Sequence, residues 1–451
     1  MKFYRGIIFC FTMFISSMIL SQSESLESYV EQGLSSNLVL KQRNLSLDNA
    51  MYALKQAKSL YLPSLDFQTI YTTAQGGRSI QLPVGDMLNP VYSTLNQFMG
   101  QNAFPLIDNQ EINFLPKNYY DARVRLSVPI INTDLIHNNR IQDKKMMIQE
   151  NEVEIYQREL VKEIKTTYYN YLSAMKAVEI HQNAIDLANE GKRTNEKLLE
   201  AGKGLHAYVI RSETEISQAT SKLISAELQA ATIQRYFNAL LNKEADAPIV
   251  IEADTKIIPF VDAGNSTASK REELESLEHM ITLREDVVRM NKQVFLPKLN
   301  GFADLGSQAE KMRFDDKSMY FMVGLQLNVP IFSGNRNNLK IKEAKNEMEI
   351  AKLQKEYVEQ QLEVAITAAY NEVLSVKKNY ESALKQLEMA ETYFRLIDKG
   401  YAAGVNTYIE TIDARSQLTT AKLAANINYY QFLGALAKLE RETASYPISN
   451  N

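Results

Sequence analysis

Residues 321–334 read FMVGLQLNVPIFSG, and the fold is organised around the segment that they open. Hydrophobic residues take every second position of this stretch until Pro330 ends the alternation. Residues 335–399 then contain neither proline nor glycine, and the breaker GYAAG at 400–404 precedes a second long run interrupted only by Gly434. This order predicts a β-strand, a helix roughly 95 Å long, a tight reversal and a returning helix. Because no ordinary globular domain needs such a helix, we expect the function to depend on reach.

The upstream half of the chain repeats this plan. Each copy is predicted to run helix, strand, loop, strand, long helix, reversal, helix. The loop between the two strands is longer in the first copy, over residues 75–117, where glycine and proline are frequent. Three pairs of short motifs relate the copies: YLPSL at 61–65 and FLPKL at 295–299, RLSVPI at 125–130 and QLNVPI at 326–331, and GLHAY at 204–208 and GVNTY at 404–408.

Composition excludes several classes of function. The 451 residues carry 50 basic and 54 acidic side chains, a net charge of -4, which argues against a nucleic-acid-binding protein. The single cysteine, Cys10, lies in the N-terminal apolar segment, so a chain cleaved after it holds no disulfide, cysteine ligand or cysteine nucleophile. The four histidines are far apart, and the GKG at 202–204 lacks the rest of a phosphate-binding loop. We therefore expect no enzyme, no catalytic residue, no metal site and no cofactor.

The N-terminus has the pattern of an export signal. Lys2 and Arg5 precede an almost wholly apolar run that ends at Leu20, and small and polar residues follow. That run is shorter than a comfortable membrane span, and no later stretch of 18 apolar residues exists. We expect residues 1–21 to be a signal peptide and the protein to be exported.

The predicted strands have one apolar and one polar face. Arg123 and Arg125 alternate with apolar neighbours, and Asp66 lies on the polar side of the preceding strand. Two arginines on one strand face cannot meet a dry core, but they can face water inside a barrel whose other face meets lipid. Four strands of about ten residues cannot close a barrel, so several chains must share one.

These features resemble those of the TolC-like outer membrane efflux family. The resemblance rests on the export signal, the duplicated plan over about residues 25–440, the paired VPI motifs and the motif GVNTYIETIDA at 404–414. It implies a homotrimer in the outer membrane of a Gram-negative bacterium, with a twelve-stranded barrel in outer-membrane lipid and a helical tunnel across the periplasm. It also implies docking to a periplasmic adaptor and an inner-membrane transporter. Such a channel conducts substrates passively in tripartite efflux or type I secretion.

We thus expect an α+β membrane protein with a shared trimeric β-barrel, four strands per chain, continued by a long α-helical coiled-coil barrel. The predicted segments are a signal peptide (1–21), a first helix (22–63), barrel strands 1 and 2 (64–129) with their outer loop (75–117), a first helical hairpin (130–243), a linker (244–270), a helix (271–296), barrel strands 3 and 4 (297–330), a second helical hairpin (331–442) and a tail (443–451).

The resemblance points to three sets of site residues. Glu410 and Asp413 share one helix face and are expected to form an acidic ring at the periplasmic entrance. The alternative is a solvated acidic face at a helix start, where acids favour the dipole. The first copy has Ile210 and Glu213 at the matching positions of the motif pair. The expected adaptor contacts are the glycines of the two reversals, Gly202, Gly204, Gly400 and Gly404. The expected residues of the barrel lumen are the charged side chains Asp66, Arg123, Arg125 and Asp304.

Two other readings stay open at this point. An exported periplasmic adaptor would have one helical hairpin flanked by small β domains, and a structural coiled coil would have no pore. The two predicted hairpins argue against the adaptor, and the structural coiled coil leaves the strands with one polar and one apolar face unexplained. For the loop 75–117, we hypothesise that it plugs or caps the outer mouth of the channel.

Overall fold

The computed structural model describes residues 26–115, 117–251 and 271–448. The predicted signal peptide, most of the predicted linker and the last three residues of the tail lie outside these ranges. The chain divides into two units. Unit 1 holds residues 1–48, 147–278 and 352–451, and unit 2 holds residues 49–146 and 279–351. Each unit is described by itself.

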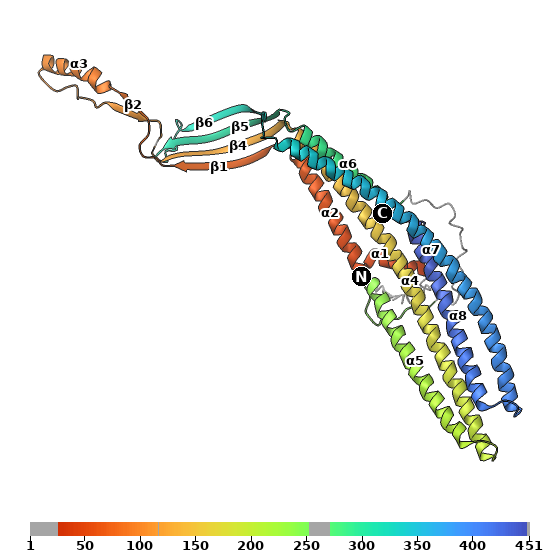
Figure 1. Ribbon diagram of the computed structural model, residues 1–451. Coiled ribbons are helices and arrows are strands. Elements are labelled where there is room, and N and C mark those ends of the chain that lie inside the picture. Colours follow the sequence, from red (N-terminus) through yellow and green to blue (C-terminus); the bar gives the residue numbers. More distant parts are fainter. Residues whose placement is uncertain (1–25, 116, 252–270, 449–451) are drawn as a thin grey trace, which may run out of the picture. The chain divides into compact units, whose positions relative to one another are not determined.

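Unit 2 contains an antiparallel sheet of four strands, as expected (Figure 1). The strands are β1 (Ser64–Thr72), β4 (Tyr119–Ile131), β5 (Lys298–Glu310) and β6 (Met319–Asn328), in the order β1-β4-β5-β6. The two halves of the sequence therefore meet where β4 pairs with β5, and a register shift between Pro129 and Ile131 ends that ladder. Within this chain, β1 and β6 each have one strand neighbour and one open edge.

The segment 75–117 is not only a loop, which corrects the prediction. It contains a second sheet of β2 (Ser79–Leu82) and β3 (Gln110–Asn113), and between them the helix α3 (Val84–Met99). Pro90 lies inside α3, and Gly100 ends the helix with φ of 63°. Proline inside a helix removes a backbone hydrogen bond, and glycine favours the left-handed C-terminal position, so a stretch that contains both residues has the sequence pattern of a loop.

The first helix of the prediction is two helices, α1 (Leu26–Ser36) and α2 (Leu38–Ser59). Asn37 separates them: its side chain accepts from the Leu40 amide at 3.0 Å and donates to the Leu240 carbonyl at 2.9 Å. Gly33 lies inside α1, where Ile164 Cδ1 would be 2.2 Å from a Cβ. Gly33 therefore allows close packing against α4, and Asn37 separates the two helices.

The remaining helices form two antiparallel hairpins, with α5 beside α4 and α8 beside α7 in Figure 1. Their bounds agree closely with the predicted segments. The first hairpin is α4 (Thr133–Glu200) and α5 (His206–Leu240), the second is α7 (Arg336–Ala402) and α8 (Tyr408–Glu442), and α6 (Glu272–Lys292) precedes β5. Residues 244–251, the described part of the predicted linker, contain no strand.

The core of unit 1 is aromatic. Tyr29 of α1 packs against Tyr168 of α4, with ring centroids 5.9 Å apart, and against Phe237 of α5 at 5.2 Å. Tyr169 and Tyr171 are also buried. Leu387 and Phe394 of α7, seven residues apart, lie against a small cluster that includes Leu418 of α8.

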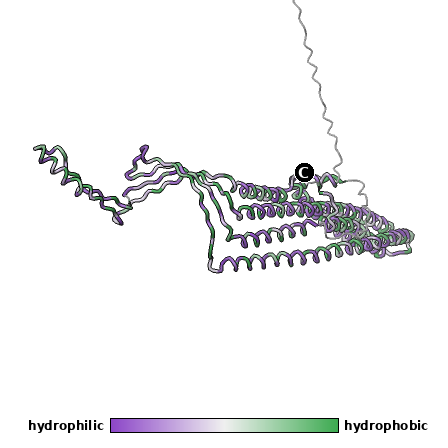
Figure 2. The backbone as a smooth tube through the Cα atoms, turned by 90° about the horizontal axis from the view of Figure 1, so that it is seen from above, coloured by the Kyte–Doolittle hydropathy of each residue, from purple (hydrophilic) through white to green (hydrophobic). Residues whose placement is uncertain are grey.

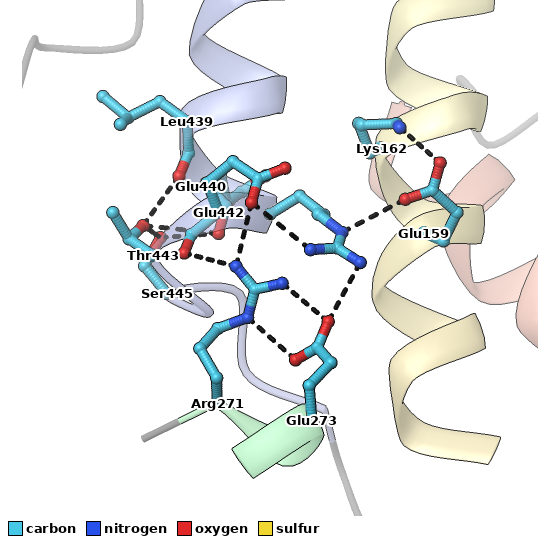
Figure 3. A network of polar contacts seen from close by, with 10 residues as sticks. Glu159, Lys162, Arg271, Glu273, Leu439, Glu440, Glu442, Thr443 and Ser445 are labelled. Carbon is cyan, nitrogen blue, oxygen red and sulfur yellow. Dashed lines mark hydrogen bonds and ion pairs between the residues drawn. The ribbon is translucent and has the colours of Figure 1, made fainter. Parts of the chain in front are cut away.

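A network of ion pairs joins the start of α6 to the end of α8 (Figure 3). The buried Arg271 guanidinium donates to both carboxylate oxygens of Glu273, at 2.6 and 2.9 Å, and to Glu442 at 2.9 Å. Arg441 bridges Glu273 and Glu159, at 3.1 Å each. Burial alone would raise the pKa of Glu273, but the hydrogen bonds from Arg271 hold that pKa below its usual range. The network fixes the end of the second hairpin to α4 and α6.

Among the described residues, no helix combines the length and the hydrophobicity that a membrane crossing requires. Figure 2 shows why: hydrophobic and hydrophilic residues are interspersed along each of the long helices.

Candidate functional site: polar sheet face and hairpin tips

Three of the predicted lumen residues line up across the sheet. The register pairs Asp66 of β1 with Arg125 of β4, and Arg125 with Asp304 of β5. Directly paired residues point to the same side of an antiparallel sheet, so these charges share one face. Arg125 donates to both oxygens of Asp304 at 2.6 Å, and the Asp304 side chain is 0% exposed. Phe302 lies on the same face, with its ring centroid 4.9 Å from the guanidinium carbon.

Arg123, the fourth predicted residue, lies two positions from Arg125 on the same face. Its guanidinium contacts Gln68 at 3.3 Å and Asp121 at 3.3 Å. Asp121 also accepts a hydrogen bond from the Tyr320 hydroxyl of β6 at 2.9 Å. Hydrogen bonds on the polar face therefore link β1, β4 and β6, and the separate Arg125–Asp304 pair links β4 to β5.

The opposite face of the sheet is apolar and exposed in the single chain. Its residues alternate with those of the polar face along every strand, and the most exposed of them belong to the edge strands β1 and β6. A soluble protein rarely exposes an apolar surface of this extent. The exposed residues are Leu65, Phe67, Tyr71, Val124, Leu126, Leu305, Phe321, Val323, Leu325 and Leu327.

The two reversals have the same backbone geometry. In the first, the Lys203 amide donates to the Leu198 carbonyl, and in the second the Val405 amide donates to the Gly400 carbonyl. The residues that precede these two amides are glycines in the left-handed region, Gly202 with φ of 71° and Gly404 with φ of 76°. Both reversals are thus Schellman motifs, in which glycine ends the helix.

The other two predicted tip glycines have a different role. Gly204 has no positive φ, and a Cβ there would lie 2.6 Å from the Leu199 amide nitrogen. Gly400 lies in the last turn of α7, and a Cβ there would meet the Asn406 side chain. Gly204 and Gly400 therefore do not supply the left-handed turn conformation, and the missing Cβ allows close packing at both positions.

Glu410 and Asp413 are exposed and lie in the first two turns of α8. Glu410 closes a capping box: its carboxylate accepts from the Thr407 amide at 2.6 Å, and the Thr407 hydroxyl accepts from the Glu410 amide at 3.3 Å. The hydrogen bond from the Thr407 backbone holds the pKa of Glu410 below its usual range. Asp413 accepts from Gln417 at 2.7 Å. Helix capping thus explains part of the acidic motif.

The matched geometry of the reversals shifts the alignment of the two copies by two residues. Gly202, not Gly204, is equivalent to Gly404. The positions equivalent to Glu410 and Asp413 are therefore Tyr208 and Arg211, and not Ile210 and Glu213 as the sequence motifs suggested. The acidic pair belongs to the second hairpin alone.

A buried polar cluster joins the two hairpins near their tips, and sequence reasoning did not find it. Tyr408 of α8 is 0% exposed, and its hydroxyl lies 2.7 Å from Ser212 Oγ and 3.2 Å from Glu215 of α5. Asn195 of α4 donates to Ser212 at 2.9 Å and accepts from Tyr401 of α7 at 2.5 Å. All four helices of the hairpins therefore contribute one hydrogen-bonding group.

Arg415 completes this tip cluster, which we define as Asn195, Ser212, Tyr401, Tyr408 and Arg415. Its guanidinium lies 3.4 Å from Glu215 and 5.8 Å from the centroid of the Tyr408 ring. Gly191 provides the space, because a Cβ there would lie 2.4 Å from the Arg415 guanidinium. The tyrosine shared by the motifs GLHAY and GVNTY was the available signal, since Tyr208 and Tyr408 pack with centroids 5.5 Å apart.

Among the described residues, no group of histidine, cysteine and acidic side chains has the arrangement of a metal site.

Known proteins share this sequence pattern and this fold. A family model described as outer membrane efflux protein matches residues 264–444. The probable efflux pump outer membrane protein TtgC of Pseudomonas putida is 22% identical over 61% of this chain, and the match spans 60% of TtgC. Outer membrane protein TolC of Escherichia coli is 22% identical, with 92% of this chain and 82% of TolC covered. The solved structure of the outer membrane protein VceC of Vibrio cholerae is 15% identical, covers 93% of this chain and 95% of its own, and has a TM-score of 0.74.

The paired hairpins and the amphipathic sheet thus define the fold of a TolC-like outer membrane channel. The sequence matches confirm the resemblance to the TolC-like outer membrane efflux family and the outer-membrane localisation expected from it. The adaptor reading is not supported, because the described chain has two long hairpins where an adaptor would have one.

Proposed function

We propose that this protein is the outer membrane channel of a tripartite efflux or type I secretion system. In this proposal three copies share one barrel of twelve strands, and substrates pass through it without chemical change. Relatives named for efflux and for secretion of an alkaline protease share the sequence pattern, so both kinds of cargo fit the proposed conduit.

The amphipathic sheet carries this proposal. One face is exposed and apolar, the other holds the buried Arg125–Asp304 pair, and the strands β1 and β6 each leave an edge open. An open edge in lipid costs several kcal/mol for each unpaired backbone group. Pairing β6 of one copy with β1 of the next satisfies both edges, and three such joints close the barrel with its polar face inward.

The helical hairpins supply the proposed contacts with partners. The reversals at Gly202 and Gly404 end in exposed turns, and the residues between the helices are mostly exposed. Turns at the tips of long hairpins are the most available surface of unit 1. We assign them to a periplasmic adaptor that couples the channel to an inner-membrane transporter, which supplies the energy. A channel of this kind needs no catalytic residue and no cofactor.

We assign the tip cluster to holding the hairpins together at the entrance. Within one chain, Asn195 and Ser212 of the first hairpin are hydrogen-bonded to each other. Ser212 is also bonded to Tyr408 of the second hairpin, and Asn195 to Tyr401. Buried polar groups lose their partners if the hairpins separate, so separation has a cost in free energy.

The acidic pair remains our candidate for an entrance ring. Three copies bring six carboxylates of Glu410 and Asp413 to one axis if α8 lines the tunnel, and such a ring attracts cations. Asp413→Asn combined with Glu410→Gln removes the charges and keeps the capping box, because glutamine also closes it. We expect a loss of cation preference relative to an exposed control on α7, Glu391→Gln. Unchanged ion selectivity would remove the pair from the entrance.

The decisive experiment on the function is single-channel conductance of the purified protein in a planar bilayer, with its mass in detergent measured alongside. Discrete conductance steps from a species of three chains are the expected result. A water-soluble monomer without conductance would overturn the proposal.

A further inference from the structure

The insertion between β1 and β4 is a built structure. One side of α3 is covered by the strap, which we define as residues 101–109. Asn89 exchanges two hydrogen bonds of 2.9 Å with the backbone of Ile107, and Asn96 exchanges two with the backbone of Phe104, at 2.7 and 2.8 Å. Paired bonds of this kind fix the helix and the strap to each other. The orientation of α3 relative to the strap is therefore fixed by these hydrogen bonds.

A different side of α3 carries an exposed apolar stripe, which we define as Leu88, Val91, Leu95 and Phe98. Their exposed fractions are 36%, 51%, 38% and 84%. The spacing of three, four and three residues is the a/d spacing of a helix that packs along another helix. The strap-facing residues lie on the neighbouring side, so the strap does not cover the stripe. Among the described residues, each side-chain hydrogen bond that we find from α3 to another segment ends in the strap.

The charge of the insertion argues against a lipid surface as the occupant of this stripe. Arg78 and Lys117 lie near the two ends of the insertion, and the sequence between them, which carries α3, contains Asp86, Asp108 and Glu111 but no lysine and no arginine. Helices that lie on a membrane surface usually carry basic residues on their polar face, which bind anionic headgroups. An acidic insertion with an a/d stripe fits another helix better than a lipid surface.

The topology says where that helix comes from. The insertion leaves the sheet at the end of β1, an edge strand, and returns at the start of β4. The other end of β4 leads into α4, so the insertion and the helices lie at opposite ends of the sheet. The open edge of β1 is the edge that a neighbouring copy pairs with in the proposed trimer. Three insertions therefore surround one axis at the outer end of one barrel, and each brings the same apolar stripe.

We propose that α3 packs through its apolar stripe against the α3 helices of the two other copies, forming a three-helix cluster over the outer mouth. This inference rests on the proposed trimer, and it names a second copy of this chain as the occupant of the stripe. The cluster buries the four stripe residues of each chain and narrows the path out of the barrel.

Cysteine crosslinking tests the contact. Val91→Cys and, as a control on the polar side of the same helix, Ser93→Cys are made in a Cys10→Ser background, so that each chain has one thiol. Both side chains are exposed in the single chain. Whole trimers in detergent and in lipid vesicles are treated with a short bismaleimide, and the trimer is verified independently by its mass.

We expect crosslinked dimers from Val91→Cys and a loss of that product in Ser93→Cys. A verified trimer in which both variants crosslink equally, or neither does, overturns the three-helix cluster and leaves the channel proposal intact. Failure to form a trimer contradicts the proposed function itself. An environment-sensitive dye on Val91→Cys that is quenched by brominated lipid would assign the stripe to the membrane and also overturn the proposal.

Conductance gives a second readout. Val91→Glu with Leu95→Glu places like charges inside the cluster and drives the helices apart, whereas Ser93→Glu with Gln97→Glu adds the same charge to the polar side. We expect larger single-channel steps from the first variant and unchanged steps from the second. Equal conductance in both variants contradicts a cluster over the mouth.

Discussion

At the scale of single residues, buried polar groups stabilise the helices of unit 1, here called the helical unit, at two places. Near the hairpin tips, Tyr408 and Ser212 are both 0% exposed and hydrogen-bonded to each other. At the other place, Arg271 and Glu273 form a bidentate pair next to Arg441. Removing one member of such a group leaves its partners buried without a hydrogen bond, which costs more than the bond itself contributes.

We expect Tyr408→Phe to lower the free energy of unfolding of the helical unit by about 1–3 kcal/mol, because Ser212 and Glu215 each lose a hydrogen bond to the hydroxyl. The measurement is the urea midpoint of far-UV circular dichroism. Tyr393→Phe, at a partly exposed position of α7, is the matched control and should leave the midpoint unchanged. Equal midpoints for the two variants would show that the tip cluster does not contribute to stability.

The pair of Arg271 and Glu273 predicts a pH dependence. Since the pKa of Glu273 is held below the ordinary value of a glutamate, 4.5, the pair stabilises fully above that pH, and the stabilisation is lost as the pH falls through the lowered pKa. We expect the urea midpoint to fall when the pH is lowered from 7 to below 4. Glu273→Gln should lower the midpoint at pH 7 and reduce its change with pH. A variant with the full pH dependence of the unchanged protein would contradict this assignment.

At the scale of elements, the two reversals use glycine for its left-handed conformation, whereas Gly434 inside α8 does not. A Cβ at Gly434 would lie 3.8 Å from Thr166 Cγ2, which is an ordinary contact. The same substitution should therefore have opposite effects at the two kinds of position.

We expect Gly404→Ala to destabilise the second hairpin by about 1–2 kcal/mol, because alanine is strained at a positive φ. Gly434→Ala should stabilise α8 by about 1 kcal/mol, because glycine is a poor helix former. Chemical denaturation of both variants checks the two signs. Destabilisation of similar size at both positions would contradict the role given to Gly404.

The sequence predicted most elements, and the failures have identifiable causes. Alternation fixed the four strands and the absence of proline fixed the long helices, because both patterns are local. The helix α3 was not predicted because Pro90 inside it and Gly100 at its end are residues that are usual in loops. The sequence alignment of the two tips was wrong by two residues. It followed the similar motifs that end in Tyr208 and Tyr408, whereas the backbone geometry of the turns matches Gly202 to Gly404. The tip cluster joins residues some 200 positions apart, which no local pattern reveals.

At the scale of the whole molecule, the two faces of the sheet predict opposite responses to charge. Val323 and Met322 are neighbours on β6 and point to opposite faces, since Met322 is paired with Asp304 and Val323 with Ala303. We expect Val323→Arg to reduce the amount of folded protein in the outer membrane, because a cation on the lipid face costs about 2–4 kcal/mol near the midplane. Met322→Arg should be tolerated. Equal amounts of both variants in the membrane fraction would contradict the assignment of the faces.

The apolar face and the open edges of the sheet also set an order of events for biogenesis. The helices of unit 1 have a buried aromatic core, so we expect a single chain to fold that part in water. The sheet has no such core, and a single chain that formed it early would expose Phe67, Phe321 and Leu325 together with two free strand edges, which favours aggregation. We therefore expect the strands of a newly exported chain to stay unpaired until copies meet at the membrane, so that assembly and insertion of the sheet are one event.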